Sequence, residues 1–222
     1  MAIIRSTVVK LSKVLSRQGL YPFLHEHLER LPEGAKVLNV GAGGDVAGVL
    51  AVHAGRRPFR VTSLDIDPGR GPDIVGDVAE YDFGKRRFDA VVMCEVLEHV
   101  REPARAIENV RRVLRPGGVL VLSTPFIFPV HDQPEDYYRF TQYGLAWLLK
   151  DFSEFAIRPR NTWAEAINVL GVRLIKENNP ACRLLAPLIV LLALAAAPVA
   201  WVLGRLVSTD FMTSGYVVRA VK

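Results

Sequence analysis

Apolar and polar residues alternate in blocks along the chain, and the blocks predict strands and helices in turn. Short apolar runs that stop at glycines or acidic residues predict strands in AKVLNV, FRVTSLDID, DIVGD, FDAVVMCE and VLVLSTPF. Apolar positions at helical spacing predict helices in VAGVLAVHAG, which Gly55 closes, and in PARAIENVRRVL. This alternation over residues 36 to about 158 predicts an α/β fold with a parallel, doubly wound sheet and helices on both faces.

Helical patterns also precede and follow the alternating region. Residues 3–17 have apolar positions at helical spacing with basic residues largely opposite, and a second helix is expected from Pro22 to about Leu31. Further on, TQYGLAWLLKDF predicts a helix that Thr141 caps, and FAIRP predicts one more strand. Helical spacing returns over residues 163–176, and the terminal GYVVRAVK predicts a last strand.

These elements divide the chain into two parts. We expect N-terminal helices over residues 1–34 and one domain over residues 35–222, because no linker separates two large domains. A hydrophobic helical insertion at about 161–208 would precede the last strand of this domain.

The apolar run RLLAPLIVLLALAAAPVAWVLGR lies inside this insertion. Between Arg183 and Arg205 it has roughly twenty uncharged, mostly apolar residues, about the length of a membrane-spanning helix. Pro187 and Pro198 each remove a backbone donor and tend to break or kink a helix. If the last strand joins the sheet, both ends of the run stay on one side of any membrane. We therefore expect one bent helix or two short helices that cover the domain or enter one leaflet, with a single span or a dimer interface as the alternatives.

Composition and charge narrow the partners. A hydrophobic fraction of 50% with 23% charged residues is typical of a globular protein. The net charge of +5 fits an anionic membrane surface or an acidic ligand, whereas the absence of a dense Lys/Arg run argues against nucleic acid. The basic residues scattered through the first helix are unlike a signal peptide. We expect a cytoplasmic protein that can contact the inner face of the membrane, and the oligomeric state stays open.

The segment VLNVGAGGD predicts a ligand site. Gly41 and Gly43 allow a ligand to approach the bare backbone, and the following helix start offers free N–H groups. The next strand ends in Asp65, a little over twenty residues past the loop, where doubly wound folds bind a ribose hydroxyl pair. The pattern therefore favours a nucleotide-like cofactor.

Five segments carry a resemblance to a known family. VLNVGAGGD, VTSLDID, IVGDV, FDAVVMCEVLEHV and VLRPGGVLVLSTP stand in the order and spacing of class I S-adenosylmethionine-dependent methyltransferases, over about residues 35–150. The resemblance implies a Rossmann-like, seven-stranded sheet whose last strand is antiparallel. It also implies S-adenosyl-L-methionine as the cofactor and methyl transfer as the reaction.

The same resemblance implies which residues bind the cofactor. The methionine part would be lined by Gly41, Ala42 and Gly43 and by Glu95 beyond the fourth strand, and the ribose hydroxyls would be bound by Asp65. The adenine would be contacted by Ile66, by the Asp77 side chain and by the Val78 backbone.

Two residues depart from the family pattern. Asn39 stands where the family usually has Asp or Glu, so it keeps an accepting oxygen but lacks the charge that complements the cofactor's ammonium group. Asp45 stands where a third glycine is often found. It would cap the following helix or partly replace the charge missing at Asn39.

The loop PVHDQPEDYYRFT follows the fifth strand, at the edge where ligands bind in such sheets. It resembles the HxxPxDYYRFT loop of a bacterial subgroup of these methyltransferases. We interpret it as an acceptor-site lid in which His131 is a general base and Asp136 orients it or the acceptor. The acceptor would be contacted by Tyr137, Tyr138 and Arg139. In the alternative, Asp136 pairs with Arg139 and the tyrosines cover the core.

The segment EVLEH raises the question of a metal. In ubiquinone-pathway O-methyltransferases, which it resembles, a divalent ion can be held by the residues equivalent to Glu95, Glu98 and His99. The same letters occur in many metal-free methyltransferases, and we predict no metal. The expected reaction is methylation, at oxygen, of a small-molecule, saccharide-like or lipid-linked acceptor. A protein or nucleic-acid acceptor and a non-catalytic scaffold or partner subunit are the alternatives.

Overall fold

The computed structural model describes residues 15–176 and 179–222. Its centre is one seven-stranded sheet of order β3-β2-β1-β4-β5-β7-β6. The strands are β1 (Lys36–Val40), β2 (Arg60–Asp65), β3 (Ile74–Val75), β4 (Phe88–Cys94), β5 (Leu114–Pro125), β6 (Glu154–Pro159) and β7 (Gly215–Val221). β7 is antiparallel to both of its neighbours, while the other pairs are parallel. The predicted Rossmann-like fold with a reversed last strand is confirmed.

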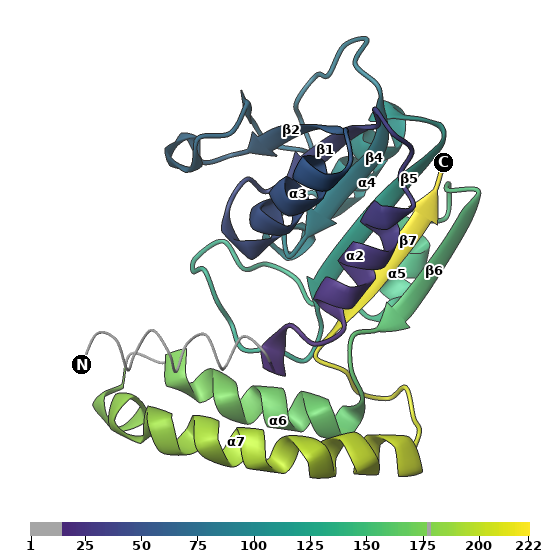
Figure 1. Cartoon of the computed structure of the whole chain (residues 1–222). Coiled ribbons are helices and arrows are strands. Elements are labelled where there is room, and N and C mark those ends of the chain that lie inside the picture. Colours follow the sequence, from purple (N-terminus) through teal and green to yellow (C-terminus); the bar gives the residue numbers. More distant parts are fainter. Residues whose placement is uncertain (1–14, 177–178) are drawn as a thin grey trace.

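Helices cover both faces of this sheet (Figure 1). Two pack on one face, α2 (Leu20–Glu29) and α3 (Gly44–Arg56), and two on the other, α4 (Pro103–Val113) and α5 (Gln142–Leu148). The short 3₁₀ helices η1 (Pro68–Arg70) and η2 (Leu97–His99) follow β2 and β4.

The strand sequences explain why the sheet is covered on both sides. In β4, Ala90 and Val92 point into the cluster beneath α2 and α3, whereas Val91 and Met93 point into the cluster beneath α4 and α5. All four are fully buried. A strand buried on both faces reads as a continuous apolar run, as FDAVVMC does.

A separate helical layer crosses the carboxyl edge of the sheet (Figure 1). It consists of α6 (Trp163–Arg173), η3 (Leu174–Lys176) and α7 (Pro180–Leu206). Thr162 and Glu165 form a capping box at the start of α6. The apolar run is one continuous helix that contains Pro187 and Pro198, so of the two predicted arrangements the structure has the single helix.

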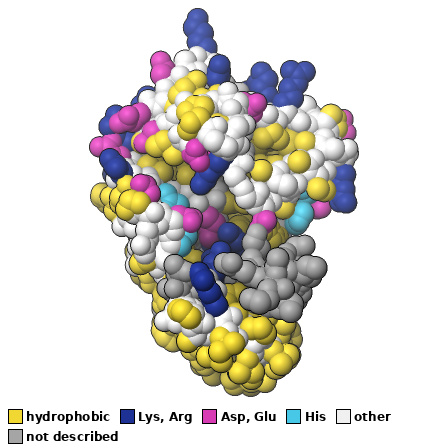
Figure 2. Space-filling model, turned by 90° about the vertical axis from the view of Figure 1, so that its left-hand side faces the viewer, with side chains coloured by type: hydrophobic (Ala, Val, Ile, Leu, Met, Phe, Trp, Pro, Cys, Tyr) yellow, Lys and Arg dark blue, Asp and Glu magenta, His cyan; other side chains and the backbone are white. Residues whose placement is uncertain are grey.

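Most of the apolar surface of α7 is exposed when only the described residues are considered. By length and composition this helix could cross a bilayer, yet only 22% of its most apolar window is buried. Its exposed large residues include Leu184, Leu188, Leu191, Val199 and Leu206. Figure 2 shows hydrophobic side chains gathered at the bottom of the molecule, where the helical layer lies. After the C-terminal end of α7 the chain returns to the sheet, because β7 follows α7 and pairs with β5.

Several boundaries differ from the predictions. α2 spans Leu20–Glu29, two residues earlier at each end than predicted, and α3 continues past Gly55 to Arg56. Residues 3–14 of the predicted basic helix lie outside the described residues. Thr141 caps α5 as predicted, by accepting from the Gly144 N–H at 3.1 Å.

Asp45 is not the cap of α3. The helix starts at Gly44, its N-cap residue is Gly43, and Asp45 lies in the first turn. There its carboxylate accepts a hydrogen bond of 3.0 Å from the Tyr21 hydroxyl. Burial, and then this hydrogen bond, raise the pKa of Tyr21 to about 12. Asp45 therefore ties α2 to α3, and it still places a negative charge where a helix N-terminus favours one.

Candidate active site

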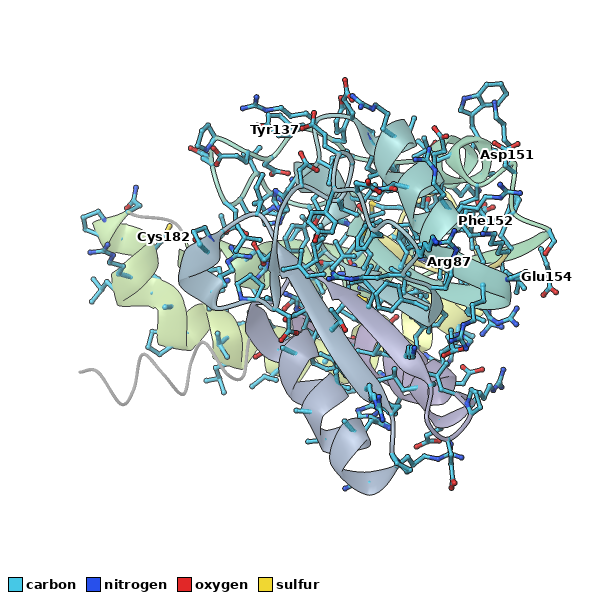
Figure 3. All side chains as sticks on the ribbon, turned by 90° about the horizontal axis from the view of Figure 1, so that it is seen from above. Arg87, Tyr137, Asp151, Phe152, Glu154 and Cys182 are labelled. Atoms are coloured by element: carbon cyan, nitrogen blue, oxygen red, sulfur yellow. The ribbon has the colours of Figure 1, made fainter. Side chains whose placement is uncertain are left out.

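A cavity of about 900 Å³ opens at the carboxyl ends of β1, β2 and β4. Its lining contains six of the predicted cofactor residues, namely Gly41, Asp65, Ile66, Asp77, Val78 and Glu95. Tyr137 of the loop after β5 lines it as well. In Figure 3, Tyr137 lies well apart from Asp151, Phe152 and Glu154, which lie together on the right-hand side of the view. The structure thus brings the predicted cofactor loop and acceptor loop to one edge.

Backbone geometry explains the glycine at the floor of the cavity. Gly41 has φ +90°, and its N–H donates to the Leu64 carbonyl at 2.8 Å. A Cβ at this position would lie 2.7 Å from Cγ2 of Val96, which is too close. The bare backbone therefore leaves room that a side chain would fill.

Asn39 supplies an unused acceptor beside this turn. Its Nδ2 donates to the Gly41 carbonyl at 3.0 Å, while its Oδ1 is buried and has no hydrogen-bond partner among the described residues. A buried oxygen without a donor is costly unless a ligand supplies one. The ammonium group of S-adenosylmethionine is such a donor, so Asn39 fits the predicted cofactor despite its missing charge.

Asp65 ends β2, and two backbone N–H groups fix the orientation of its carboxylate. Its Oδ2 accepts from the Ala42 N–H at 2.7 Å, and its Oδ1 accepts from the Asp67 N–H at 2.9 Å. The side chain is 4% exposed and also meets Arg70 at 3.3 Å. Because the Arg70 side chain is 53% exposed, it can move aside for a ribose without losing buried contacts.

The residues expected to contact the adenine lie just before η1 and in the turn after β3. Ile66 lines the cavity and is 69% exposed, so an adenine ring bound there would cover it. The Asp77 carboxylate accepts from the Ala79 N–H at 2.8 Å, and the Val78 carbonyl accepts from Asn109 at 2.8 Å. These bonds fix the turn against α4.

Glu95 lies between two arginines at the end of β4. It has φ +57°, and its carboxylate contacts Arg160, Arg17 at 3.2 Å and the Ser123 hydroxyl at 2.8 Å. Burial alone would raise the pKa of Glu95, but the charges of Arg160 and Arg17 lower it to about 2. Glu95 is therefore ionised, and its charge is balanced by the two arginines.

A second cluster joins Glu98, His99 and His131. Oε1 of Glu98 is buried without a hydrogen-bond partner among the described residues, and it lies 3.7 Å from His99 Nε2 and 3.9 Å from His131 Nε2. His99 Nδ1 lies 2.6 Å from the Glu135 carbonyl, which only accepts, so Nε2 keeps its lone pair. Burial and the charge of Glu95 raise the pKa of Glu98 well above its usual range.

The ligand atoms of Glu98, His99 and His131 all lie within 4.8 Å of one another. They could hold a divalent cation, and His131 takes the place that the metal alternative gave to Glu95. The same arrangement leaves Nε2 of His131 free to accept a proton. A single nitrogen cannot bind a metal and act as a base at once, so the two roles exclude each other.

The acceptor loop combines both interpretations made from its sequence. Asp136 accepts from both Nη atoms of Arg139 at 2.6 Å, as the structural alternative expected. It also accepts from the His131 backbone N–H at 2.8 Å and lies 3.2 Å from His131 Nδ1. Burial would raise the pKa of Asp136, but the hydrogen bonds from Arg139 and from His131 lower it to about 2. The carboxylate therefore orients the imidazole, and Arg139 orients the carboxylate.

The two tyrosines of the loop are partly exposed, and one of them packs on the core. Tyr138 stacks on the buried Phe140, with ring centroids 5.6 Å apart, as the structural alternative expected. Tyr137 is 39% and Tyr138 is 38% exposed. The Tyr137 hydroxyl accepts from Arg101 at 3.1 Å, and the Tyr138 hydroxyl donates to the Arg101 carbonyl at 2.9 Å. They tie the loop to η2, and their proposed contacts with the acceptor stay predictions.

Three arginines of this site carried no signal in the sequence analysis. Arg160 follows β6, Arg173 ends α6, and Arg17 precedes α2. They converge only because the helical layer and the N-terminal segment meet at the carboxyl edge. No spacing rule connects positions so far apart.

The strand order, the glycine turn after β1 and the acid at the end of β2 together define a class I methyltransferase domain. The chain belongs to the methyltransferase-domain family, whose model matches residues 15–165. S-adenosylmethionine is the cofactor of this family, and that prediction is confirmed. Membership of the subgroup suggested by the acceptor loop stays a prediction.

Among curated relatives, the ubiquinone biosynthesis O-methyltransferase of Alkalilimnicola ehrlichii is 30% identical over 164 residues. The match covers 62% of this chain and 62% of that protein. The chain therefore matches less than two thirds of the length of this relative.

Solved structures share the fold at low identity. A methyltransferase from Archaeoglobus fulgidus has a TM-score of 0.60 at 14% identity, covering 96% of this chain and 94% of its own. Phosphoethanolamine N-methyltransferase 2 of Haemonchus contortus, in complex with S-adenosyl-L-methionine, has a TM-score of 0.60 at 14% identity, covering 90% and 51%.

Proposed function

We propose that this protein transfers a methyl group from S-adenosylmethionine to an oxygen of a small, amphipathic acceptor. The observation that carries the choice of oxygen is Nε2 of His131, which makes no hydrogen bond among the described residues and belongs to a ring packed against His99 of the cavity lining. A hydroxyl must lose its proton as it is methylated, and a neutral imidazole can accept it. The O-methyltransferase name of the relative from Alkalilimnicola ehrlichii supports the same choice.

The loop prepares His131 for this task. Burial lowers the pKa of His131, so the ring is neutral at pH 7. The Asp136 carboxylate 3.2 Å from Nδ1 holds the proton on that atom and leaves Nε2 as the acceptor. S-adenosylmethionine supplies the methyl group, and the chain has only to place the acceptor and take its proton.

The acceptor's apolar part is inferred from the helical layer. α7 presents exposed leucines and valines at the same edge as the cavity. α6 and η3 precede α7, and β7 of the sheet follows it. Because the flanking segments on both sides belong to the same domain, α7 is better suited to lie in one leaflet than to span the membrane. We propose that α7 holds the protein at the inner face of a membrane, where a lipid-linked acceptor is met. A saccharide-like acceptor would use the same base but not this surface.

The base is tested with His131→Ala and the matched control Gln133→Asn, which changes an exposed residue of the same loop that does not line the cavity. Purified protein, radiolabelled S-adenosylmethionine and a bacterial total-lipid extract would yield a labelled lipid. We expect His131→Ala to lower turnover about 10²–10⁴-fold with the same cofactor affinity, and Gln133→Asn to lower it less than threefold. Unchanged turnover in His131→Ala would remove this residue from the proposal.

The membrane contact is tested by flotation with vesicles of phosphatidylglycerol and phosphatidylethanolamine. We expect the wild type to float and the variant Leu188→Asp/Leu191→Asp to stay at the bottom of the gradient, because charges disfavour insertion. The matched control Val52→Asp changes an exposed apolar residue of α3 and should float. Flotation of the α7 variant would contradict the anchor.

A further inference from the structure

Two guanidinium groups pair with one carboxylate beside the acceptor loop, and a third lies within electrostatic range of it. Arg17 and Arg160 both pair with Glu95, and their charges also act on Arg173. Among the described residues, the acids that act on Arg173 include Glu95, which already pairs with the other two arginines, and the exposed Asp132. The three arginines therefore share the charge of one buried carboxylate.

Arg173 is the cation without a partner. Among the described residues its guanidinium makes no hydrogen bond or ion pair. Its Cζ atom lies over the Phe128 ring, 4.2 Å from the ring centroid. Burial, and then the repulsion from Arg17, lower the pKa of Arg173 to about 10. The group stays charged at pH 7, so the fold holds a half-buried cation whose counter-charge is missing.

Arg173 lies between His131, the candidate base, and the apolar helix α7. The Phe128 ring beneath it also packs against the His131 ring, with centroids 5.4 Å apart. The preceding residue, Val172, is fully buried against Val190 of α7. Figure 2 shows basic and acidic side chains in the hollow between the sheet domain and the apolar layer.

We propose that Arg173, with Arg17 beside it, binds an anionic group of the acceptor, whose apolar part extends along α7. The acceptor class is then an amphiphile that carries a phosphate or carboxylate close to the hydroxyl that is methylated. Five donors in a planar fork suit either anion, and the Phe128 ring packs against the guanidinium. This inference rests on the proposed function, because it assigns the acceptor of that site.

The probe is decyl phosphate below its micellar concentration, titrated by calorimetry into protein saturated with S-adenosylhomocysteine. Decanoate is the carboxylate arm, and inorganic phosphate tests a headgroup without a tail. The variants are Arg173→Gln, Arg173→Lys and the matched control Arg205→Gln, which removes an exposed arginine at the end of α7. S-adenosylmethionine affinity is measured for each variant.

We expect Arg173→Gln to weaken decyl phosphate or decanoate binding at least tenfold, Arg173→Lys to weaken it less, and Arg205→Gln to change it less than twofold. Inorganic phosphate should bind at least tenfold more weakly than decyl phosphate. S-adenosylmethionine affinity should stay within twofold throughout.

Three results would overturn the inference. Equal losses in Arg173→Gln and Arg205→Gln would mean that any cation near the apolar helix suffices. An Arg173→Gln variant that binds decyl phosphate normally but S-adenosylmethionine tenfold more weakly would assign the arginine to the cofactor's carboxylate. Equal affinity for inorganic and decyl phosphate would exclude the amphiphile. If the wild type does not bind S-adenosylmethionine, the proposed function fails instead.

Discussion

Replacing Glu95 with glutamine would remove the carboxylate that Arg17 and Arg160 share. The Arg160 side chain is 1% exposed, so it would lose its counter-charge inside the protein. Its Nε already lacks a hydrogen-bond partner among the described residues. Glutamine keeps the shape of the side chain, and the change therefore tests charge rather than packing. Removing one partner of a buried pair costs about 3–5 kcal/mol of unfolding free energy.

The pKa of Glu95 gives an independent magnitude. Arg160 and Arg17 lower it from 4.5 to about 2 in the folded protein, where the side chain is 14% exposed. One pKa unit is about 1.4 kcal/mol, so the ionised carboxylate contributes about 3 kcal/mol at neutral pH. Because the folded pKa lies below the unfolded one, this stability is complete above the unfolded pKa and is lost as the pH falls toward the folded pKa.

The assay is urea unfolding of the wild type and Glu95→Gln, followed by tryptophan fluorescence at pH 7 and pH 3.5. The difference between the two proteins largely cancels other titrating groups. We expect it to be about 3 kcal/mol at pH 7 and smaller by roughly a third at pH 3.5. The matched control is Glu154→Gln, which breaks an exposed pair with Arg219 and should cost about 0.5 kcal/mol or less. A loss under about 1 kcal/mol at pH 7, or one that does not shrink in acid, would refute this account.

Three further predictions concern the cofactor, the helical layer and the histidine cluster. Asp65→Asn should weaken S-adenosylmethionine binding about 10–100-fold by calorimetry, because a charged acceptor for the ribose is lost. Gly204→Ala should lower the unfolding free energy by about 1–3 kcal/mol, since its Cβ would lie 2.6 Å from Thr162 Cβ; Gly171→Ala, whose Cβ would meet nothing within 4 Å, should not destabilise the fold. If His131 is the base, EDTA should leave methyl transfer unchanged, and a loss restored by Mg²⁺ would make His131 a metal ligand instead.

The sheet and the cofactor end of the site could be predicted from the sequence alone. Strand periodicity, the glycines after β1 and the acids after β2 and β3 are local signals, because each residue takes its role from its place at a strand end. Asp65 and Gly41 could therefore be located without a structure, and both line the cavity. The boundary errors at α2 and α3 were small, since helix ends depend on caps that compete over one or two residues.

Which charges meet depends on the packing of distant elements. Arg17, Arg160 and Arg173 come from three distant segments, and no periodicity links them to Glu95. The role of the apolar run was also undecided by its sequence, because the same residues suit a buried helix, a span or a surface anchor. In the structure α7 packs on α6 and η3, and most of its apolar window stays exposed. Local patterns fix elements and strand-end sites, whereas the pairing of distant charges and the exposure of a face depend on how the elements pack.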